Sequence, residues 1–184
     1  MIDILGNETT RISLIVCVKN SIISIPDSIR NLTSLVILDV CCNQLTFLPD
    51  SIGSLFSLTR LTVDSNQLTI IPDSIGNLAS LCYLHVNSNQ LTVLPDSIGN
   101  LNQLVELTAN HNRLILLPDS IGNLASLIDL NVNSNQLAQL PDSIGNLTRL
   151  ADLHVYNNPI TSTLAGKNEV KRLFERDGLD LYVD

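Results

Sequence analysis

Asparagine recurs every 23 residues along most of this 184-residue chain. The positions are Asn20, Asn43, Asn66, Asn89, Asn112, Asn135 and Asn158. Each asparagine stands in a frame of leucine, isoleucine and valine that repeats with it, as in Leu35-x-x-Leu38-x-Val40-x-x-Asn43-x-Leu45. A fixed period of about 20 to 29 residues with this frame predicts a stack of short, similar turns rather than one compact core.

The first half of each unit predicts a strand. Around Leu38, Asp39 and Val40 apolar and polar residues alternate, which is typical of a strand buried on one face. One such strand per unit would stack into a parallel sheet. The asparagine follows where the chain must turn inward, and its buried amide can bond main-chain groups that otherwise lack partners. We therefore expect the asparagines to form an internal hydrogen-bond ladder.

The second half of each unit, Leu-Pro-Asp-Ser-Ile-Gly-Asn, predicts a short helical turn on the opposite side. Pro cannot continue a strand ladder, Asp and Ser favour helix starts, and Gly permits a reversal of the chain. The aspartates of this element should form a row with a spacing of about 5 Å. They are Asp27, Asp50, Asp73, Asp96, Asp119 and Asp142. A carboxylate that caps its own helix accounts for the row better than a calcium site or a basic partner does.

These motifs resemble the leucine-rich-repeat family, and the resemblance covers residues 9–160. It implies an α/β solenoid: a right-handed horseshoe with a parallel β-sheet on the concave face and short helical or 3-10 turns on the convex face. Residues 1–8 then form a thin N-terminal cap, residues 9–160 form seven units of which the last is truncated, and residues 161–184 form a helical cap.

The C-terminal cap is expected to contain one helix, from Asn168 to Asp177. Val170, Leu173 and Phe174 share one face of that helix and would seal the last hydrophobic layer.

Composition and charge narrow the function classes. The net charge is -8 and only ten Lys and Arg are spread over the chain, which argues against a nucleic-acid partner. The chain contains no run of about 18 apolar residues, so no membrane span is predicted. The start of the chain lacks the pattern of a secretory signal, and the four cysteines form no paired motif, so we expect a reducing cytoplasmic location.

The positions that differ between units indicate where a function resides. The units that start at Leu78 and Leu124 agree at 18 of 23 positions. Three of the five differences lie in or beside the strand: Cys82/Ile128, Tyr83/Asp129 and His85/Asn131. A uniform scaffold with a variable sheet face is expected of a module that binds a partner on that face.

Equivalent positions in adjacent units become neighbours across the sheet, about 5 Å apart. The predicted partner-binding residues on the concave face are Arg60, Tyr83, His85, Glu106, Asp129, Asn131, Asp152, His154 and Tyr156. Tyr and Arg are frequent binding hot spots, and the carboxylates complement a basic segment. We therefore predict a protein or peptide partner with a basic segment on the C-terminal half of the sheet.

The sequence does not indicate an enzyme. His85 and His154 stand three units apart, roughly 15 Å, which is too far for one metal ion. No positioned nucleophile, oxyanion turn or phosphate-binding loop accompanies them. We therefore expect a non-catalytic module without metal or cofactor.

The first strand region, Ile12 to Val18, is apolar on both faces. Either residues 1–8 cover it, or it forms a homodimer, because an uncapped terminal strand invites edge pairing. A structural or self-associating solenoid without a dedicated ligand is thus the alternative function. The Leu-Pro-Asp-Ser-Ile-Gly-Asn-Leu turn itself resembles both Ras-group intracellular scaffolds and small bacterial leucine-rich-repeat proteins, some of which act as effectors inside host cells.

Overall fold

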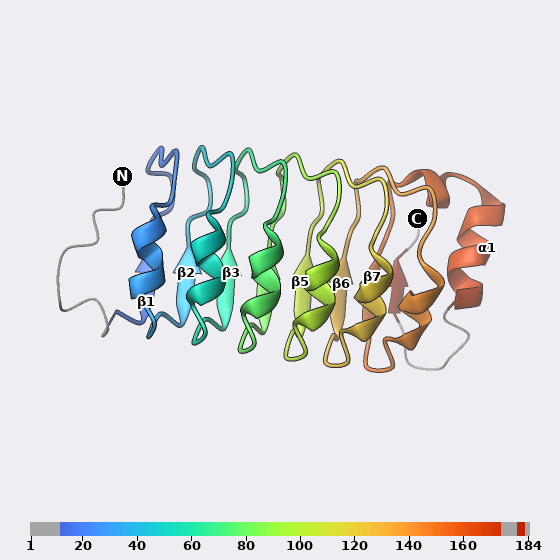
Figure 1. Ribbon diagram of the computed structural model, residues 1–184. Helices are drawn as coiled ribbons and strands as arrows, with labels where there is room; N and C mark the ends of the chain where they lie inside the picture. The colour runs from blue at the N-terminus through green and yellow to red at the C-terminus, as the bar shows by residue number, and fades with distance from the viewer. Residues whose placement is uncertain (1–11, 174–179, 183–184) are drawn as a thin grey trace.

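A computed structural model describes residues 12–173 and 180–182. Its units stack side by side into a solenoid with one parallel sheet along one side (Figure 1). Strand order follows chain order from β1 to β8. The strands are β1 (Leu14–Val16), β2 (Ile37–Asp39), β3 (Arg60–Thr62), β4 (Tyr83–His85), β5 (Glu106–Thr108), β6 (Asp129–Asn131), β7 (Asp152–His154) and β8 (Asp180–Tyr182). The predicted solenoid and the seven predicted strands are confirmed.

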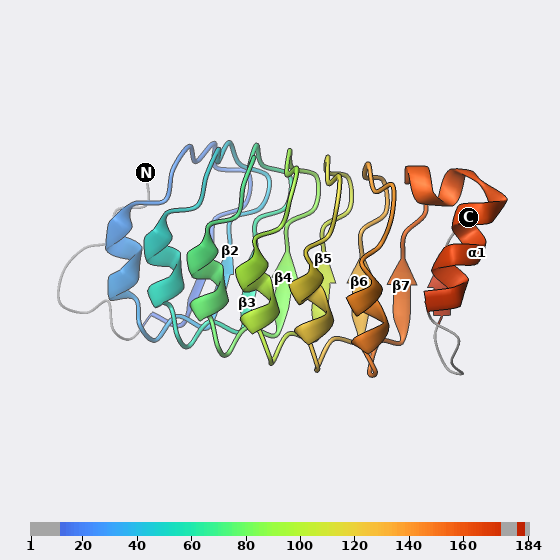
Figure 2. The ribbon, with the colours of Figure 1, turned by 45° about the vertical axis from the view of Figure 1, so that its right-hand side comes forward.

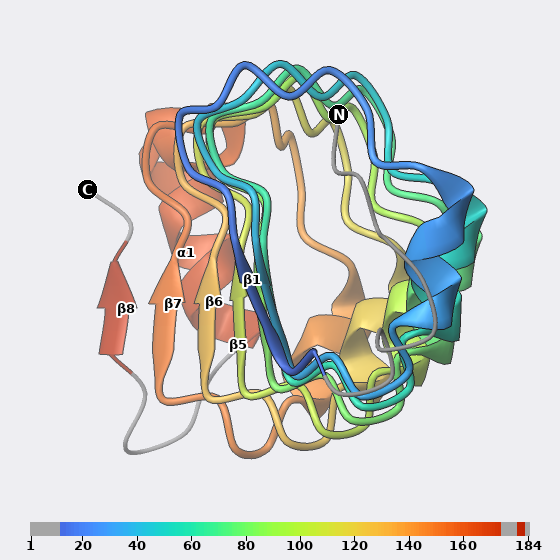
Figure 3. The same cartoon turned by 90° about the vertical axis from the view of Figure 1, so that its left-hand side faces the viewer.

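Each strand is only three residues long because the chain turns away at once on both sides. In β4, Leu84 is fully buried while Tyr83 and His85 flank it on the outer side. The view along the stack shows the sheet on one side and the helical turns on the other (Figure 3). Between them lies a continuous core of leucine, isoleucine and valine, and alternate strand residues remain outside it.

The helical turns are 3-10 helices of four or five residues. They are η2 (Asp27–Asn31), η3 (Asp50–Ser54), η4 (Asp73–Asn77), η5 (Asp96–Asn100), η6 (Asp119–Asn123), η7 (Asp142–Asn146) and η8 (Pro159–Ser162). The prediction that the aspartates cap these helices is wrong. In η3 the N-cap is Pro49, whose carbonyl accepts from the Ile52 N–H at 2.9 Å, and no side chain caps the helix. The aspartates stand exposed at the first helical position instead.

The repeated glycine has a different role from the predicted chain reversal. A Cβ atom at Gly99 would lie 2.5 Å from the carbonyl oxygen of Ser120 in the next unit. Glycine therefore permits neighbouring 3-10 helices to pack backbone against backbone.

The asparagine ladder is confirmed for six of its seven members. In the fourth, Asn89 Oδ1 accepts from the Leu68 N–H at 3.0 Å, while Nδ2 donates to the carbonyls of Val63 and Val86 at 3.1 Å. Asn20 is the exception, because its side chain is exposed and donates only to the Val18 carbonyl. It has no preceding unit to bond to within the described chain.

The C-terminal end differs from the prediction in two ways. Helix α1 (Leu164–Leu173) starts four residues earlier than expected, because Thr163 Oγ1 accepts the Gly166 N–H at 3.1 Å and caps the helix. Val170 is fully buried as predicted, whereas Phe174 and the expected helix end lie outside the described residues. The chain then returns to add β8 beside β7, an element that was not predicted.

Figure 2 shows α1 at the end of the stack, beyond β7. The expected N-terminal cap, residues 1–8, lies outside the described residues. No helix within residues 12–173 has the length and apolar character that a bilayer crossing requires.

Candidate functional site

The sheet face is formed by the outward side chains of the strands, and its rows are those predicted. The first row, at the first residue of each strand, is Leu14, Ile37, Arg60, Tyr83, Glu106, Asp129 and Asp152. The second row, at the third residue, is Val16, Asp39, Thr62, His85, Thr108, Asn131 and His154. The predicted register is therefore confirmed, and eight of the nine candidate residues lie in these two rows, while Tyr156 lies two positions beyond β7.

Arg60 and Tyr83 form a preorganised pair near the middle of the sheet face. The guanidinium carbon of Arg60 lies 4.4 Å from the centroid of the Tyr83 ring. A cation above an aromatic face is attracted by the ring quadrupole, so the two side chains hold each other in position.

Three carboxylates lie side by side in the first row. Strand pairing places Glu106, Asp129 and Asp152 on the adjacent strands β5, β6 and β7. Burial raises the pKa of Asp129, the nearby Glu106 and Asp152 charges raise it further, and His154 and His85 oppose the shift. Asp129 Oδ1 is also buried and accepts no hydrogen bond from any described residue. The strip of Glu106, Asp129 and Asp152, here called the carboxylate strip, thus holds an acceptor that lacks a partner.

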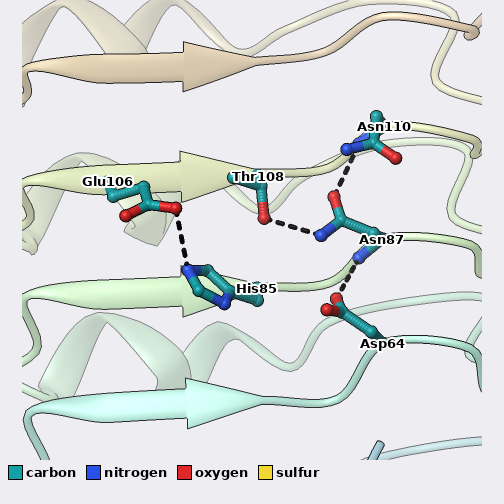
Figure 4. Close-up of polar contacts among 6 residues, drawn as sticks. All are labelled: Asp64, His85, Asn87, Glu106, Thr108 and Asn110. Atoms are coloured by element: carbon teal, nitrogen blue, oxygen red, sulfur yellow. Dashed lines mark hydrogen bonds and ion pairs between the residues drawn. The ribbon is translucent and has the colours of Figure 1, made fainter. Parts of the chain in front are cut away.

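His85 joins the carboxylate strip to the centre of the sheet face. Its Nε2 lies 3.1 Å from Glu106 Oε1 (Figure 4). The two groups are close but not aligned for a hydrogen bond, so the contact is an ion pair only in the protonated form of His85.

A polar chain supports the face beyond the strand ends. Asp64 Oδ1 accepts the Asn87 N–H at 2.7 Å, and Asn87 Oδ1 accepts the Asn110 N–H at 3.0 Å (Figure 4). Asn87 Nδ2 also donates to Thr108 Oγ1 at 2.8 Å. These side chains hold adjacent units in register, which is a structural role.

β8 adds an aromatic residue that sequence reasoning missed. The Tyr182 ring stacks on His154, with centroids 4.2 Å apart and an interplanar angle of 6°. The signal was present, because Asp180-Leu181-Tyr182 repeats the Asp-Leu-polar pattern of Asp152-Leu153-His154. The 23-residue period does not predict this strand, because Asp180-Leu181-Tyr182 follows the helix and falls outside that spacing.

Two remaining candidates, Asn131 and Tyr156, supply acceptors for hydrogen bonds within the chain. The Asn131 side chain accepts the Asn133 N–H at 3.3 Å, and the half-buried Tyr156 contributes its carbonyl to Asn158 Nδ2 at 3.2 Å.

Burial, with help from Asp39, raises the pKa of the Cys41 thiol to about 12, so it stays protonated at neutral pH. Within residues 12–173 and 180–182, no three His, Cys, Asp or Glu side chains come together as a metal site.

Comparison with known families decides the classification. A family model described as a leucine-rich repeat region matches residues 14–88 and 71–175. The chain belongs to the leucine-rich-repeat family. This fold generally mediates protein–protein interaction. A comparison with curated protein sequences gave no match.

Solved structures with the same fold come from bacteria and plants. A leucine-rich-repeat protein of Leptospira interrogans is 29% identical, with a TM-score of 0.56, over 89% of this chain and 52% of that one. An internalin of Listeria monocytogenes is 25% identical, with a TM-score of 0.69, over 86% of this chain and 50% of that one. The leucine-rich-repeat chain spans about half the length of each.

A plant structure shows higher identity over a smaller share of its length. It is the ectodomain of a membrane receptor kinase from Arabidopsis thaliana in complex with Casparian strip integrity factor 2. It is 34% identical, with a TM-score of 0.66, over 73% of this chain and 17% of that one. The likeness thus extends from bacterial proteins to the ectodomain of a plant receptor kinase.

Proposed function

We propose that this leucine-rich-repeat protein is a non-catalytic recognition module whose sheet face binds a protein or peptide with a basic segment. The observation that carries this proposal is the carboxylate strip, with Asp129 half-buried and its Oδ1 without a hydrogen-bond partner in the described chain. A guanidinium or ammonium group placed there would supply that partner and neutralise the repulsion among Glu106, Asp129 and Asp152.

Aromatic groups on both sides of the strip would extend the contact. Tyr83 lies beside Glu106 on the adjacent strand, and the stacked His154 and Tyr182 lie beyond Asp129. Rigid aromatic side chains supply contact area at a low entropic cost, and charge complementarity adds specificity. The plant receptor in complex with Casparian strip integrity factor 2 supports this mode of action by analogy only.

The alternative is a self-associating solenoid. It is favoured by Leu14 and Val16 of β1, whose side chains are 55% and 57% exposed on the sheet face. A homodimer through this strand would bury both. Light scattering over a concentration series tests it, and a mass that stays monomeric at every concentration would exclude it.

The place of action is a further part of the proposal. A cytoplasmic protein, or a bacterial effector delivered into a host cytosol, is supported by the free state of Cys17, Cys41, Cys42 and Cys82 and by the likeness to bacterial leucine-rich-repeat proteins. Fractionation of the native cell, and of host cells exposed to it, tests this location.

Affinity capture with matched variants tests the binding proposal. Wild-type protein, Tyr83→Ala/Asp129→Asn and the control Asp142→Asn are used as bait in lysate of the native cell. Asp142 is exposed on η7, away from the sheet face. A true partner is captured by wild type and Asp142→Asn and is lost with the double variant.

The captured protein is then purified and titrated. We expect its affinity to fall by at least a hundredfold in Tyr83→Ala/Asp129→Asn, because an aromatic anchor and a buried charge contact are both removed. Equal affinity for wild type and the double variant would remove the sheet face from consideration.

A further inference from the structure

A groove runs along the side of the solenoid opposite the sheet, at the starts of the 3-10 helices. It has a volume of about 1150 Å³ and spans η2 to the start of η5. A smaller hollow of about 320 Å³ continues it past η6, where Leu116, Asp119 and Gln139 line the wall. This outer groove is distinct from the sheet face, so the proposed function does not account for it.

One wall of the outer groove is a row of large apolar side chains. Phe47, Ile70, Val93 and Leu116 occupy one position in four successive units and are 50%, 56%, 37% and 45% exposed. The core does not require them, because the next residue in each unit is the buried one, as Leu48 is after Phe47. At the same position the flanking units carry Ser24 and Gln139. The scaffold therefore tolerates polar residues here, and a contiguous apolar row of this kind marks an interaction site.

The other wall carries the exposed aspartates. Asp50, Asp73 and Asp96 line the groove or its continuation, and their carboxylates form no hydrogen bond or ion pair with any described residue. None of them caps its helix. At the η2 end Arg30 also lines the groove and Asp27 accepts a hydrogen bond from Ser51, so the groove is apolar along one side and negative along the other from η3 onward.

The distance between adjacent units determines which backbone conformation of a bound segment matches the apolar row. Adjacent strands of the sheet lie about 4.8 Å apart, which gives the approximate rise from one unit to the next along the stack. An α-helix lying along the stack presents one side chain per turn of about 5.4 Å, whereas an extended chain presents a residue on one face only every 6.7 Å or so. Over four units only the helix keeps one apolar contact per unit.

We propose that the outer groove docks an amphipathic α-helix of a partner protein. The helix places one aliphatic side chain per turn against Phe47, Ile70, Val93 and Leu116. Lys and Arg along its flank face the aspartate row. This arrangement covers the apolar row and complements the negative wall.

A designed peptide serves as the probe. It is an 18-residue labelled amphipathic helix with leucine on one stripe and Lys or Arg on the adjoining stripe. A second peptide has the same composition with two central prolines, which prevent the helix. Fluorescence anisotropy measures both against wild-type protein, Phe47→Gln/Ile70→Gln and Asp50→Asn/Asp73→Asn.

Two control variants separate this site from general attraction to an acidic protein. Asp142→Asn/Glu169→Gln makes the same charge change away from both the groove and the sheet face, and Asp142→Asn alone changes an equivalent aspartate beside the polar Gln139. We expect both groove variants to weaken the helical probe at least tenfold and both controls to change it less than twofold.

Three outcomes would overturn the proposal. The first is an equal loss of affinity in groove and control variants, and the second is equal binding of the proline peptide. The third is self-association that sedimentation detects in wild-type protein and not in Phe47→Gln/Ile70→Gln, because a second copy of the chain would then cover the groove. Because the sheet face is tested with its own captured partner and the variant Tyr83→Ala/Asp129→Asn, failure of this site leaves the result for the sheet face separate.

Discussion

The amide of Asn89 contacts main-chain groups of its own unit and the preceding one. It accepts one N–H and reaches three carbonyl oxygens within 3.1 Å. Asp129 is the opposite case among the half-buried polar side chains, because its Oδ1 receives no hydrogen bond within the described residues. At the scale of single residues, the Asn89 amide stabilises the stack, whereas Asp129 Oδ1 can accept a hydrogen bond from a ligand.

Asn89→Ala should lower the free energy of unfolding by about 3 kcal/mol, because one buried N–H and several carbonyls lose their partner. Asn20→Ala is the matched control at the same repeat position. Asn20 is exposed, so its removal should cost only about 0.5 kcal/mol. Urea denaturation measures both, and equal losses would contradict the structural role assigned to the buried ladder.

Asp129→Asn should raise the melting temperature at pH 7. Burial and the Glu106 and Asp152 charges raise the pKa of Asp129 in the folded protein. The native state therefore holds this proton more tightly than the unfolded state, so stability falls as pH rises through the window between the two pKa values. The variant removes that loss, and its advantage should vanish at pH 3. A variant that melts below wild type at pH 7 would contradict this account.

The 3-10 helices of adjacent units pack backbone against backbone. Gly53, Gly76, Gly99 and Gly122 each bring the backbone against a serine carbonyl of the next unit. Gly145 is different, because the nearest atom to its Cβ position is the Leu173 carbonyl oxygen at 3.2 Å. The last unit therefore meets α1 with more room than the inner units leave each other.

Gly99→Ala should destabilise the protein by about 2 kcal/mol, because the added methyl group meets backbone that cannot move without separating two units. Gly145→Ala should cost clearly less, since its neighbour needs to shift by only a few tenths of an ångström. Thermal melts of the two variants test this difference. A Gly145 variant as damaged as the Gly99 variant would show that the glycine serves another purpose.

The repeated elements could be predicted from the sequence, whereas the terminal elements could be predicted only in part. Periodicity identified Leu84 as buried and aligned Tyr83 with Glu106, because identical units must stack in one register. It could not place β8, whose pairing with β7 depends on how far the chain travels after α1. The apolar spacing of Val170 and Leu173 predicted a helix that starts at Asn168, whereas α1 starts earlier because Thr163 caps it.

Side-chain contacts on the sheet face were beyond sequence reasoning for a related reason. The rows place Arg60 beside Tyr83 and His85 one position from Glu106, yet the ring and ion-pair contacts depend on side-chain conformations. The desolvation of Asp129 depends on what surrounds it on both neighbouring strands. The unpartnered oxygen that supports the proposed site could therefore be found only in the structure.

The whole molecule is a stack in which each unit contacts its neighbours, and it exposes two long surfaces. One is the sheet face with the carboxylate strip, and the other is the outer groove with its apolar row. A solenoid with a uniform core can vary either surface without disturbing the stack. In this leucine-rich-repeat protein, we assign partner recognition by the carboxylate strip to the sheet face.

Carboxylate footprinting of the protein with and without its captured partner tests that assignment most directly. A carbodiimide couples an amine to accessible carboxylates, and mass spectrometry measures the extent at each position. Bound partner should reduce labelling of Glu106 and Asp152 severalfold while Asp50 and Asp142 label as before. Unchanged labelling of Glu106 and Asp152 under saturating partner would contradict the account.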